Sequence, residues 1–202
     1  MSVELRRETE TDHEEVENLT REAFWDIFKP GCDEHLLVHK VRKVPAFVPE
    51  LDFVAVEDGR IVGNIIYSQA KVVGGDGNAH EVVTFGPVSV LPSFQRRGIG
   101  SALIEQTMKL AREMGFRAIV IFGHPAYYSR FGFENAERFG ITTADGTNFD
   151  AFMALELREG GLEGVTGRFY EDPVFRMDKD EVEAFDRRFP HKEKHVTDTQ
   201  FR

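Results

Sequence analysis

Residues 88–104 read VSVLPSFQRRGIGSALI, and the interpretation of the whole chain begins from this stretch. An apolar segment runs through a proline and two arginines into Gly98 and Gly100, and a helical pattern of apolar residues follows. After that pattern comes a second apolar segment, residues 117–122. The order of strand, glycine turn, helix and strand predicts a βαβ crossover, which makes the two strands parallel.

The glycine turn has the composition of an anion-binding loop. A helix N-terminus presents unpaired backbone N–H groups and a partial positive charge, and glycine lets a phosphate approach them closely. Residues 96–101, RRGIGS, therefore suit a diphosphate. The P-loop pattern is excluded because no Gly-Lys-Ser/Thr follows, and the dinucleotide fingerprint is excluded because a third glycine is missing. The alternative is that the glycines only turn the chain and that both arginines are solvated.

The rest of the chain alternates between helical and strand-like patterns. Asp58-Gly59 indicates a hairpin, Gly86-Pro87 a bulge or bend, and Gly160-Gly161 the turn of a C-terminal hairpin. The expected strands are residues 3–7, 51–56, 61–73, 81–90 and 117–122, and the expected helices are residues 13–27, 33–43 and 100–114. A short helix is expected near residues 179–189, followed by a tail that frays.

Composition limits the classes of function. The chain has 202 residues, 41% of them hydrophobic with 18 Phe, which suits one domain with a real core. The formal net charge of −10 argues against a nucleic-acid partner. The sequence contains no run of about eighteen apolar residues, which a membrane-spanning helix would need, and its N-terminus has no signal-peptide pattern. We therefore expect a cytoplasmic protein with no membrane partner. The single cysteine, Cys32, fits a reducing compartment, and no metal site is expected.

Two motifs together resemble those of the GNAT acyltransferase superfamily. The first is QRRGIGSAL after a strand, and the second is YSRFGF, which follows one helix and one strand later. The likeness extends over roughly residues 3–158. It is closest to a subgroup of predicted bacterial and archaeal N-acetyltransferases with an HPAYYxRFGF motif. The resemblance implies an α/β fold of mixed α+β type: a central mixed, mostly antiparallel sheet that is splayed between its fourth and fifth strands, flanked by helices, and binding acetyl-CoA in that opening.

The resemblance also implies roles for particular residues. In the family, the backbone of the strand before the loop pairs with the pantetheine amides, and the loop amides hold the pyrophosphate. In many members, a tyrosine four residues before the glycine of the Gly-Phe pair protonates the departing thiolate, and Tyr128 occupies that position. The expected cofactor-binding residues are Val88, Ser89, Val90, Gln95, Arg96, Arg97, Gly98, Ile99, Gly100 and Ser101.

The general base has no assignment from the motifs. Thr84 stands where some family members have a glutamate, and Glu81 should point to the opposite face of its strand. His124 has a suitable titration range and is a second catalytic candidate, although a histidine before proline is also a common turn residue. His35 and His39, four residues apart on a helix, are expected to line the acceptor site or to form a polar surface.

The leading hypothesis is an acetyl-CoA-dependent N-acetyltransferase, an enzyme that acetylates a primary amine of a small molecule or a protein. The alternatives are a non-catalytic acyl-CoA sensor or scaffold, and an unrelated α/β domain that binds free phosphate. We expect residues 1–160 to form the acetyltransferase domain and residues 161–202 a C-terminal extension on the same domain. The prediction also allows a homodimer.

Overall fold

The computed structural model describes residues 3–200. These residues form two compact units: one contains residues 3–66, 86–104 and 173–200, and the other contains residues 67–85 and 105–172. Strands β3 and β4 and helix α3 contribute residues to both units. Within the described residues, no helix combines the length and apolar character needed to cross a membrane.

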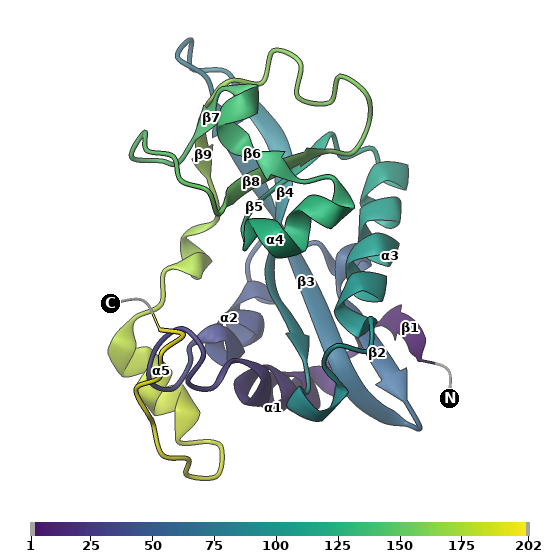
Figure 1. Ribbon diagram of the computed structural model, residues 1–202, viewed down its shortest axis with the longest axis vertical. Helices are drawn as coiled ribbons and strands as arrows, with labels where there is room; N and C mark the ends of the chain where they lie inside the picture. Colours follow the sequence, from purple (N-terminus) through teal and green to yellow (C-terminus); the bar gives the residue numbers. More distant parts are fainter. Residues whose placement is uncertain (1–2, 201–202) are drawn as a thin grey trace. The chain divides into compact units, whose positions relative to one another are not determined.

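The helices and strands, labelled in Figure 1, follow one another as β1 (Glu4–Arg7), α1 (His13–Phe24), α2 (Glu34–Val41), β2 (Phe53–Glu57), β3 (Arg60–Val73), β4 (Ala79–Val90), α3 (Ile99–Glu113), β5 (Ala118–Phe122), α4 (Pro125–Tyr128), β6 (Glu134–Asn135), β7 (Ile141–Thr142), β8 (Phe152–Glu156), β9 (Gly167–Tyr170) and α5 (Lys179–Asp186). Short 3-10 turns connect several of them, including Pro92–Phe94 before α3 and Pro173–Phe175 before α5.

In the first unit, β1 pairs antiparallel with β2, and β2 pairs antiparallel with the start of β3. The β2–β3 turn has φ angles of 51° at Asp58 and 78° at Gly59. Positive φ at both central residues is typical of the tight hairpin turns that match strand twist, so the predicted Asp-Gly hairpin is confirmed.

Helices α1 and α2 pack against each other in this unit. The apolar pattern of α1 predicts a helix as far as Ile27, but the helix ends at Phe24. Asp26 has a φ of 60°, a left-handed conformation that stops the helix, and Ile27 is 39% exposed. The prediction was wrong here because hydrophobic spacing continued past a backbone break that the sequence pattern does not encode.

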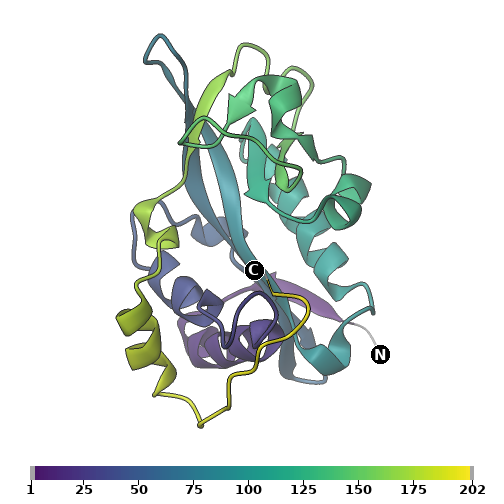
Figure 2. The same ribbon diagram turned by 60° about the vertical axis from the view of Figure 1, so that its left-hand side comes forward.

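The described part of the C-terminal segment, residues 191–200, has no helix or strand, and we expected it to fray. It nevertheless bonds to the end of α1, beside which it lies in Figure 2. The indole of Trp25 donates to the carbonyl oxygen of Glu193 over 2.9 Å, and Lys192 reaches Glu22 over 2.8 Å. These contacts connect the end of the described chain to its first long helix.

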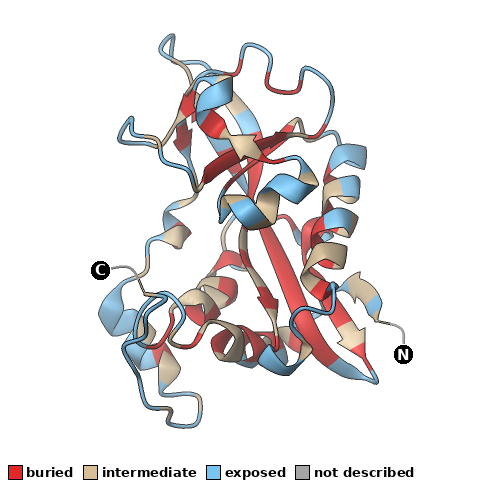
Figure 3. Cartoon of the chain, in the orientation of Figure 1, coloured by how far each residue is buried: buried red, intermediate tan, exposed pale blue. Residues whose placement is uncertain are grey.

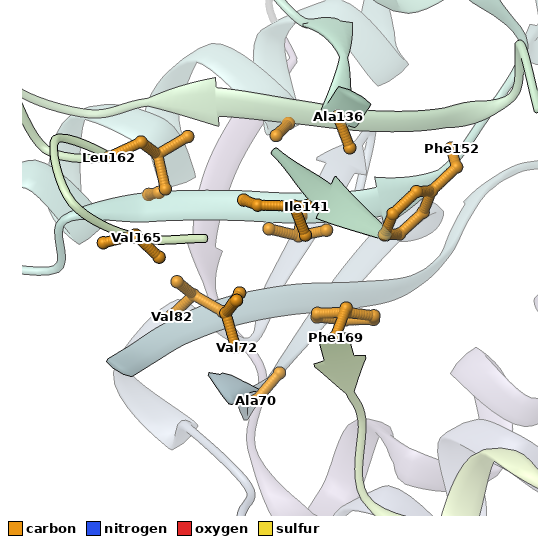
Figure 4. Close-up of a cluster of buried hydrophobic side chains, with 12 residues drawn as sticks. Ala70, Val72, Val82, Ala136, Ile141, Phe152, Leu162, Val165 and Phe169 are labelled. Carbon is orange, nitrogen blue, oxygen red and sulfur yellow. The ribbon is translucent and has the colours of Figure 1, made fainter. Parts of the chain in front are cut away.

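In the second unit, β4 and β5 are parallel, as the βαβ pattern predicts. Within the described residues they share one register pair, Val83 with Ile119, whereas β5 and β8 share five antiparallel pairs. Most of the other pairings are antiparallel, so the predicted mixed, mostly antiparallel sheet is confirmed. Figure 4 shows the apolar cluster that fills this unit, which comprises Ala70, Val72, Val82, Ala118, Val120, Ala136, Ile141, Phe152, Ala154, Leu162, Val165 and Phe169.

The predicted C-terminal hairpin is wrong. Strand β8 pairs with β5 and β6, whereas β9 pairs with β3 and β7. The chain turns at Gly160-Gly161 as expected, but there is no room beside Gly161 for a side chain, because a Cβ would overlap the carbonyl oxygen of Arg117. The turn therefore packs against the start of β5, and the two apolar segments belong to different parts of the sheet.

Candidate functional site

The loop between β4 and α3 is shaped by two residues with positive φ. Arg96 has a φ of 61° and Gly98 a φ of 83°. The backbone N–H of Ala102 donates to the carbonyl oxygen of Gly98 over 2.9 Å, which starts the helical hydrogen-bond pattern. The N–H groups of Ile99, Gly100 and Ser101 precede that pattern, so the helix itself supplies them with no acceptor.

Gly98 faces open space. A Cβ built on it would have no other atom within 4 Å, so the absence of a side chain leaves the backbone accessible. Together with the N–H groups that follow, this makes a cradle for an anion at the N-terminus of a fifteen-residue helix. The backbone geometry at residues 98–101 is therefore suited to a diphosphate.

The side chains of the loop are held by its neighbours. Gln95 donates to the carbonyl oxygen of Val90 over 3.1 Å. The guanidinium of Arg97 pairs with the buried carboxylate of Glu57 over 2.5 Å and lies 5.0 Å from the centre of the Phe94 ring. Both arginines are exposed, but Arg97 pairs with Glu57, so Arg96 offers the freer positive charge of the two.

The end of β4 is anchored to α1 by a buried hydroxyl contact. Ser89 is fully buried, and its hydroxyl lies 3.0 Å from that of Thr20 on α1, whereas Val88 and Val90 are only partly buried. A Cβ at Gly63 on β3 would lie 3.1 Å from the carbonyl oxygen of Ser89 and even closer to the side chain of Ile99. Gly63 thus lets β3 approach the loop, a role that no sequence motif indicated.

Tyr128 lies in the second unit, at the end of α4. Its ring packs among aromatic side chains, with ring centres 5.8 Å from both Phe85 and Phe133 and 5.0 Å from Tyr127. Within residues 3–200, the Tyr128 hydroxyl makes no hydrogen bond. Burial, with a smaller contribution from Tyr127, raises the pKa of Tyr128 well above its ordinary value. The phenol therefore stays protonated at neutral pH, as a proton donor must.

His124 begins α4 as its N-terminal cap. Its Nδ1 accepts a hydrogen bond from the backbone N–H of Ala126 over 3.2 Å. Because Nδ1 accepts, the neutral ring carries its proton on Nε2. The turn role that the sequence suggested for this histidine is therefore present in the structure, and proton uptake at Nδ1 would require the cap to be released.

The two other positions considered for a base differ in exposure. Thr84 is buried on β4 and cannot act as a base, and Glu81 on the same strand is exposed. Neither position supplies a buried carboxylate.

His35 does not line an open site, whereas His39 is only partly buried. His35 is completely buried, with Nδ1 3.4 Å from Cys32 Sγ and Nε2 3.3 Å from Asp186 Oδ1. His39 Nδ1 lies 2.7 Å from Glu17 Oε1. For His35 the expectation was wrong because Phe185 and Phe189 of the C-terminal segment cover its ring, which the helix pattern could not reveal. For His39 it stays a prediction, since this side chain lines a pocket between α2 and α5. In the described part of the chain, no group of three or more His, Cys, Asp or Glu side chains could hold a metal ion.

Comparisons with known proteins define the class of protein. The model of the acetyltransferase (GNAT) family matches residues 14–133, more than half of the chain. The chain is also 30% identical over 164 residues to the uncharacterized N-acetyltransferase YhbS of Escherichia coli K12, covering 81% of this chain and 92% of YhbS. The chain belongs to the acetyltransferase (GNAT) family.

Two solved structures agree with this assignment. The structure of Escherichia coli YhbS in complex with CoA aligns with a TM-score of 0.76 at 28% identity, covering 87% of this chain and 93% of that one. A GNAT family acetyltransferase from Brucella melitensis in complex with acetyl-CoA aligns with a TM-score of 0.70, also at 28% identity, covering 87% and 99%. The resemblance inferred from the two motifs is confirmed at the level of the superfamily.

Proposed function

We propose that the protein is an acetyl-CoA-dependent N-acetyltransferase that acetylates a primary amine of a small molecule or a protein. The observation that carries this proposal is the anion cradle at residues 98–101 in a chain of the GNAT family. The related structures described with CoA and with acetyl-CoA support the same cofactor for this chain.

The residues of the loop fit the cofactor. The N–H groups of Gly98, Ile99, Gly100 and Ser101 would hold the pyrophosphate, with the exposed side chain of Arg96 adding positive charge. Val88, Ser89 and Val90 would offer backbone groups to the pantetheine amides, and Gln95 and Arg97 would hold the loop in shape. The open space at Gly98 is where a side chain would obstruct such a ligand.

Acetyl-CoA supplies an acetyl group activated as a thioester. Tyr128 acts as general acid and donates its proton to the leaving thiolate, since its phenol is protonated at neutral pH. His124 is the proposed acceptor of the proton from the amine, provided that its Nδ1 gives up the N–H of Ala126. We also propose a cytoplasmic location, which the single cysteine favours.

An acceptor screen with thiol release as the readout tests the activity, and calorimetry tests the cofactor site. Gly100→Val should weaken binding of CoA about tenfold or more, because a branched side chain crowds the amides that hold the pyrophosphate. Lys109→Ala, at an exposed position further along α3, should leave CoA affinity unchanged.

The two assays separate the alternatives. Unchanged CoA affinity in a folded Gly100→Val variant would contradict the cofactor site. Tight acetyl-CoA binding by the wild type without turnover of any amine would instead favour the sensor. The acceptor screen therefore decides between enzyme and binding module.

A further inference from the structure

A pocket of about 540 Å³ lies between α2 and α5, within the first unit. Figures 1 and 2 both show these helices side by side, with α5 contributed by the C-terminal segment. The volume of the pocket falls within the range of small-molecule sites, which is roughly 300–1,000 Å³. The residues that line it are Leu36, His39, Lys40, Lys43, Val44, Val174, Glu181, Ala184, Phe185 and Arg188.

The pocket has an apolar floor. Leu36, Val174 and Phe185 are each less than a tenth exposed, and Phe185 packs on the ring of His39 with a distance of 4.7 Å between ring centres. Val44 extends this surface at the end of α2. A ligand seated here would therefore bury an apolar body.

The rim of the pocket is cationic, although the whole chain carries a net charge of −10. Lys40 pairs with Glu181 over 2.6 Å. Lys43 Nζ instead lies 2.5 Å from His39 Nε2, and the Arg188 guanidinium lies 4.8 Å from the centre of the Phe185 ring. Within residues 3–200, neither Lys43 nor Arg188 has a carboxylate partner.

The position of His39 explains why the Lys43 ammonium can still bind an anion. His39 Nδ1 lies 2.7 Å from Glu17 Oε1, so the ring donates there, and Nε2 accepts from the Lys43 ammonium. The ammonium retains further N–H donors, because Lys offers three. Two cations without acidic partners thus border an apolar floor.

We propose that this pocket binds an amphipathic carboxylate, a small molecule with an apolar body and one anionic end. Its apolar body lies on Leu36 and Phe185, and its carboxylate is held by Lys43 and Arg188. Apolar burial and charge-assisted hydrogen bonds then act together, which neither a neutral lipid nor a bare anion would allow.

Octanoate is the probe, with octanol as its uncharged counterpart and inorganic phosphate as its counterpart without a tail. Titration of the full chain, followed by NMR amide shifts of α2 and α5, should give a Kd on the order of 1 mM for octanoate. Octanol and phosphate should each bind at least about tenfold more weakly. Lys43→Gln and Arg188→Gln should each weaken octanoate binding about fivefold, as loss of one exposed ion pair does.

Two further variants test the location. Ala184→Trp places a large ring in the pocket from an exposed position of α5 and should abolish octanoate binding while circular dichroism stays native. Lys109→Gln removes an exposed lysine outside the pocket and should bind octanoate as the wild type does. The proposal is overturned if the wild type shows no saturable binding, or if binding is equal in the wild type, Lys43→Gln, Arg188→Gln and Ala184→Trp.

Discussion

At the scale of single residues, the position of the Tyr128 ring depends on Gly123 having no side chain. A Cβ at Gly123 would overlap Cδ2 and Cε2 of the Tyr128 ring. Gly123 therefore provides the space that the phenol occupies, next to Phe85 and Phe133. Within the described residues the hydroxyl has no hydrogen-bond partner, which suits the proposed role of donating its proton to a substrate.

Tyr128→Phe removes only the hydroxyl and keeps the aromatic packing. We expect the rate of acetyl transfer to fall about a hundredfold, the usual effect of losing a general acid, while acetyl-CoA affinity is unchanged. Steady-state kinetics with an amine found by the screen, together with calorimetry, check this expectation. Wild-type turnover in the variant would exclude Tyr128 as the acid.

Gly123→Ala complements that variant, because it keeps the phenol and displaces its ring. Its turnover should also fall, since the added methyl group occupies the space of the Tyr128 ring. Gly75→Ala is the matched control, because a Cβ there meets nothing within 4 Å. Reduced turnover in both glycine variants would point to a general loss of stability.

Residues that stand in a motif could be proposed for the site from the sequence, and those defined by contacts through space could not. Gly98, Gly100 and Tyr128 stand in short patterns, and their roles in the site stay predictions. Gly63 and Gly123 have no pattern, because the atoms next to them come from other strands and from α3 and α4. The pairing of Arg97 with Glu57, forty residues away, was equally invisible in the sequence.

At the scale of elements, α5 is joined to α1 and α2 by a buried ionic contact. Arg21, only 2% exposed, reaches Asp186 over 2.6 Å, and His35 Nε2 lies 3.3 Å from the same carboxylate. The His35 ring also packs against Phe185 and Phe189, with ring centres 5.3 Å and 5.4 Å away. This contact anchors the C-terminal helix.

The buried imidazole predicts a loss of stability in acid. Burial lowers the pKa of His35 to about 4, from an ordinary value of 6.5. Between those pH values the unfolded chain takes up a proton that the folded protein does not, so the free energy of unfolding falls as the pH drops from 6.5 to 4. The loss is at most about 3 kcal/mol, and it should be smaller in His35→Gln, which cannot titrate.

Urea unfolding at several pH values between 4 and 7 measures this difference. Carboxylates elsewhere change the free energy of unfolding in acid in the wild type and in His35→Gln alike, so the difference between the two proteins isolates the contribution of His35. His191→Gln, at an exposed position, should keep the wild-type pH dependence. Equal slopes in the wild type and His35→Gln would show that the imidazole does not stay neutral in the folded state.

Periodicity predicted most elements but not their partners. The helix after the glycine turn has one buried face and one exposed face, as Figure 3 shows for α3, and its pattern was clear. The segments that became β8 and β9 were equally clear as strands. Their pairing with β5 and β3 was not, because adjacent strands with a glycine turn between them have the same local pattern whether or not they form a hairpin.

At the scale of the whole molecule, no sequence pattern indicated that strands β3 and β4 and helix α3 contribute residues to two compact units. The hydrophobic patterns of the sequence describe single helices and strands, whereas the division into two compact units depends on contacts between segments far apart in the chain. The net charge of −10, in contrast, is read directly from the sequence and constrains any anionic ligand. Such a ligand is repelled by the molecule as a whole and must be attracted by a local positive site.

The ionic strength dependence of CoA binding tests how these two effects combine. Arg96 and Arg97 lie within the loop, and a Debye length is about 10 Å at 0.1 M salt, so added salt screens their attraction for CoA. The same salt screens the repulsion from the net charge of −10. We expect the attraction to dominate, because both arginines lie in the loop proposed to hold the pyrophosphate. Calorimetry from about 0.05 to 0.5 M NaCl should then show wild-type affinity that falls with salt, and a weaker affinity with a flatter salt dependence when both arginines are changed to Gln. Arg96→Gln alone should flatten it more than Arg97→Gln, because Glu57 already pairs with Arg97. A double variant with the wild-type salt slope would leave the backbone amides as the sole attraction.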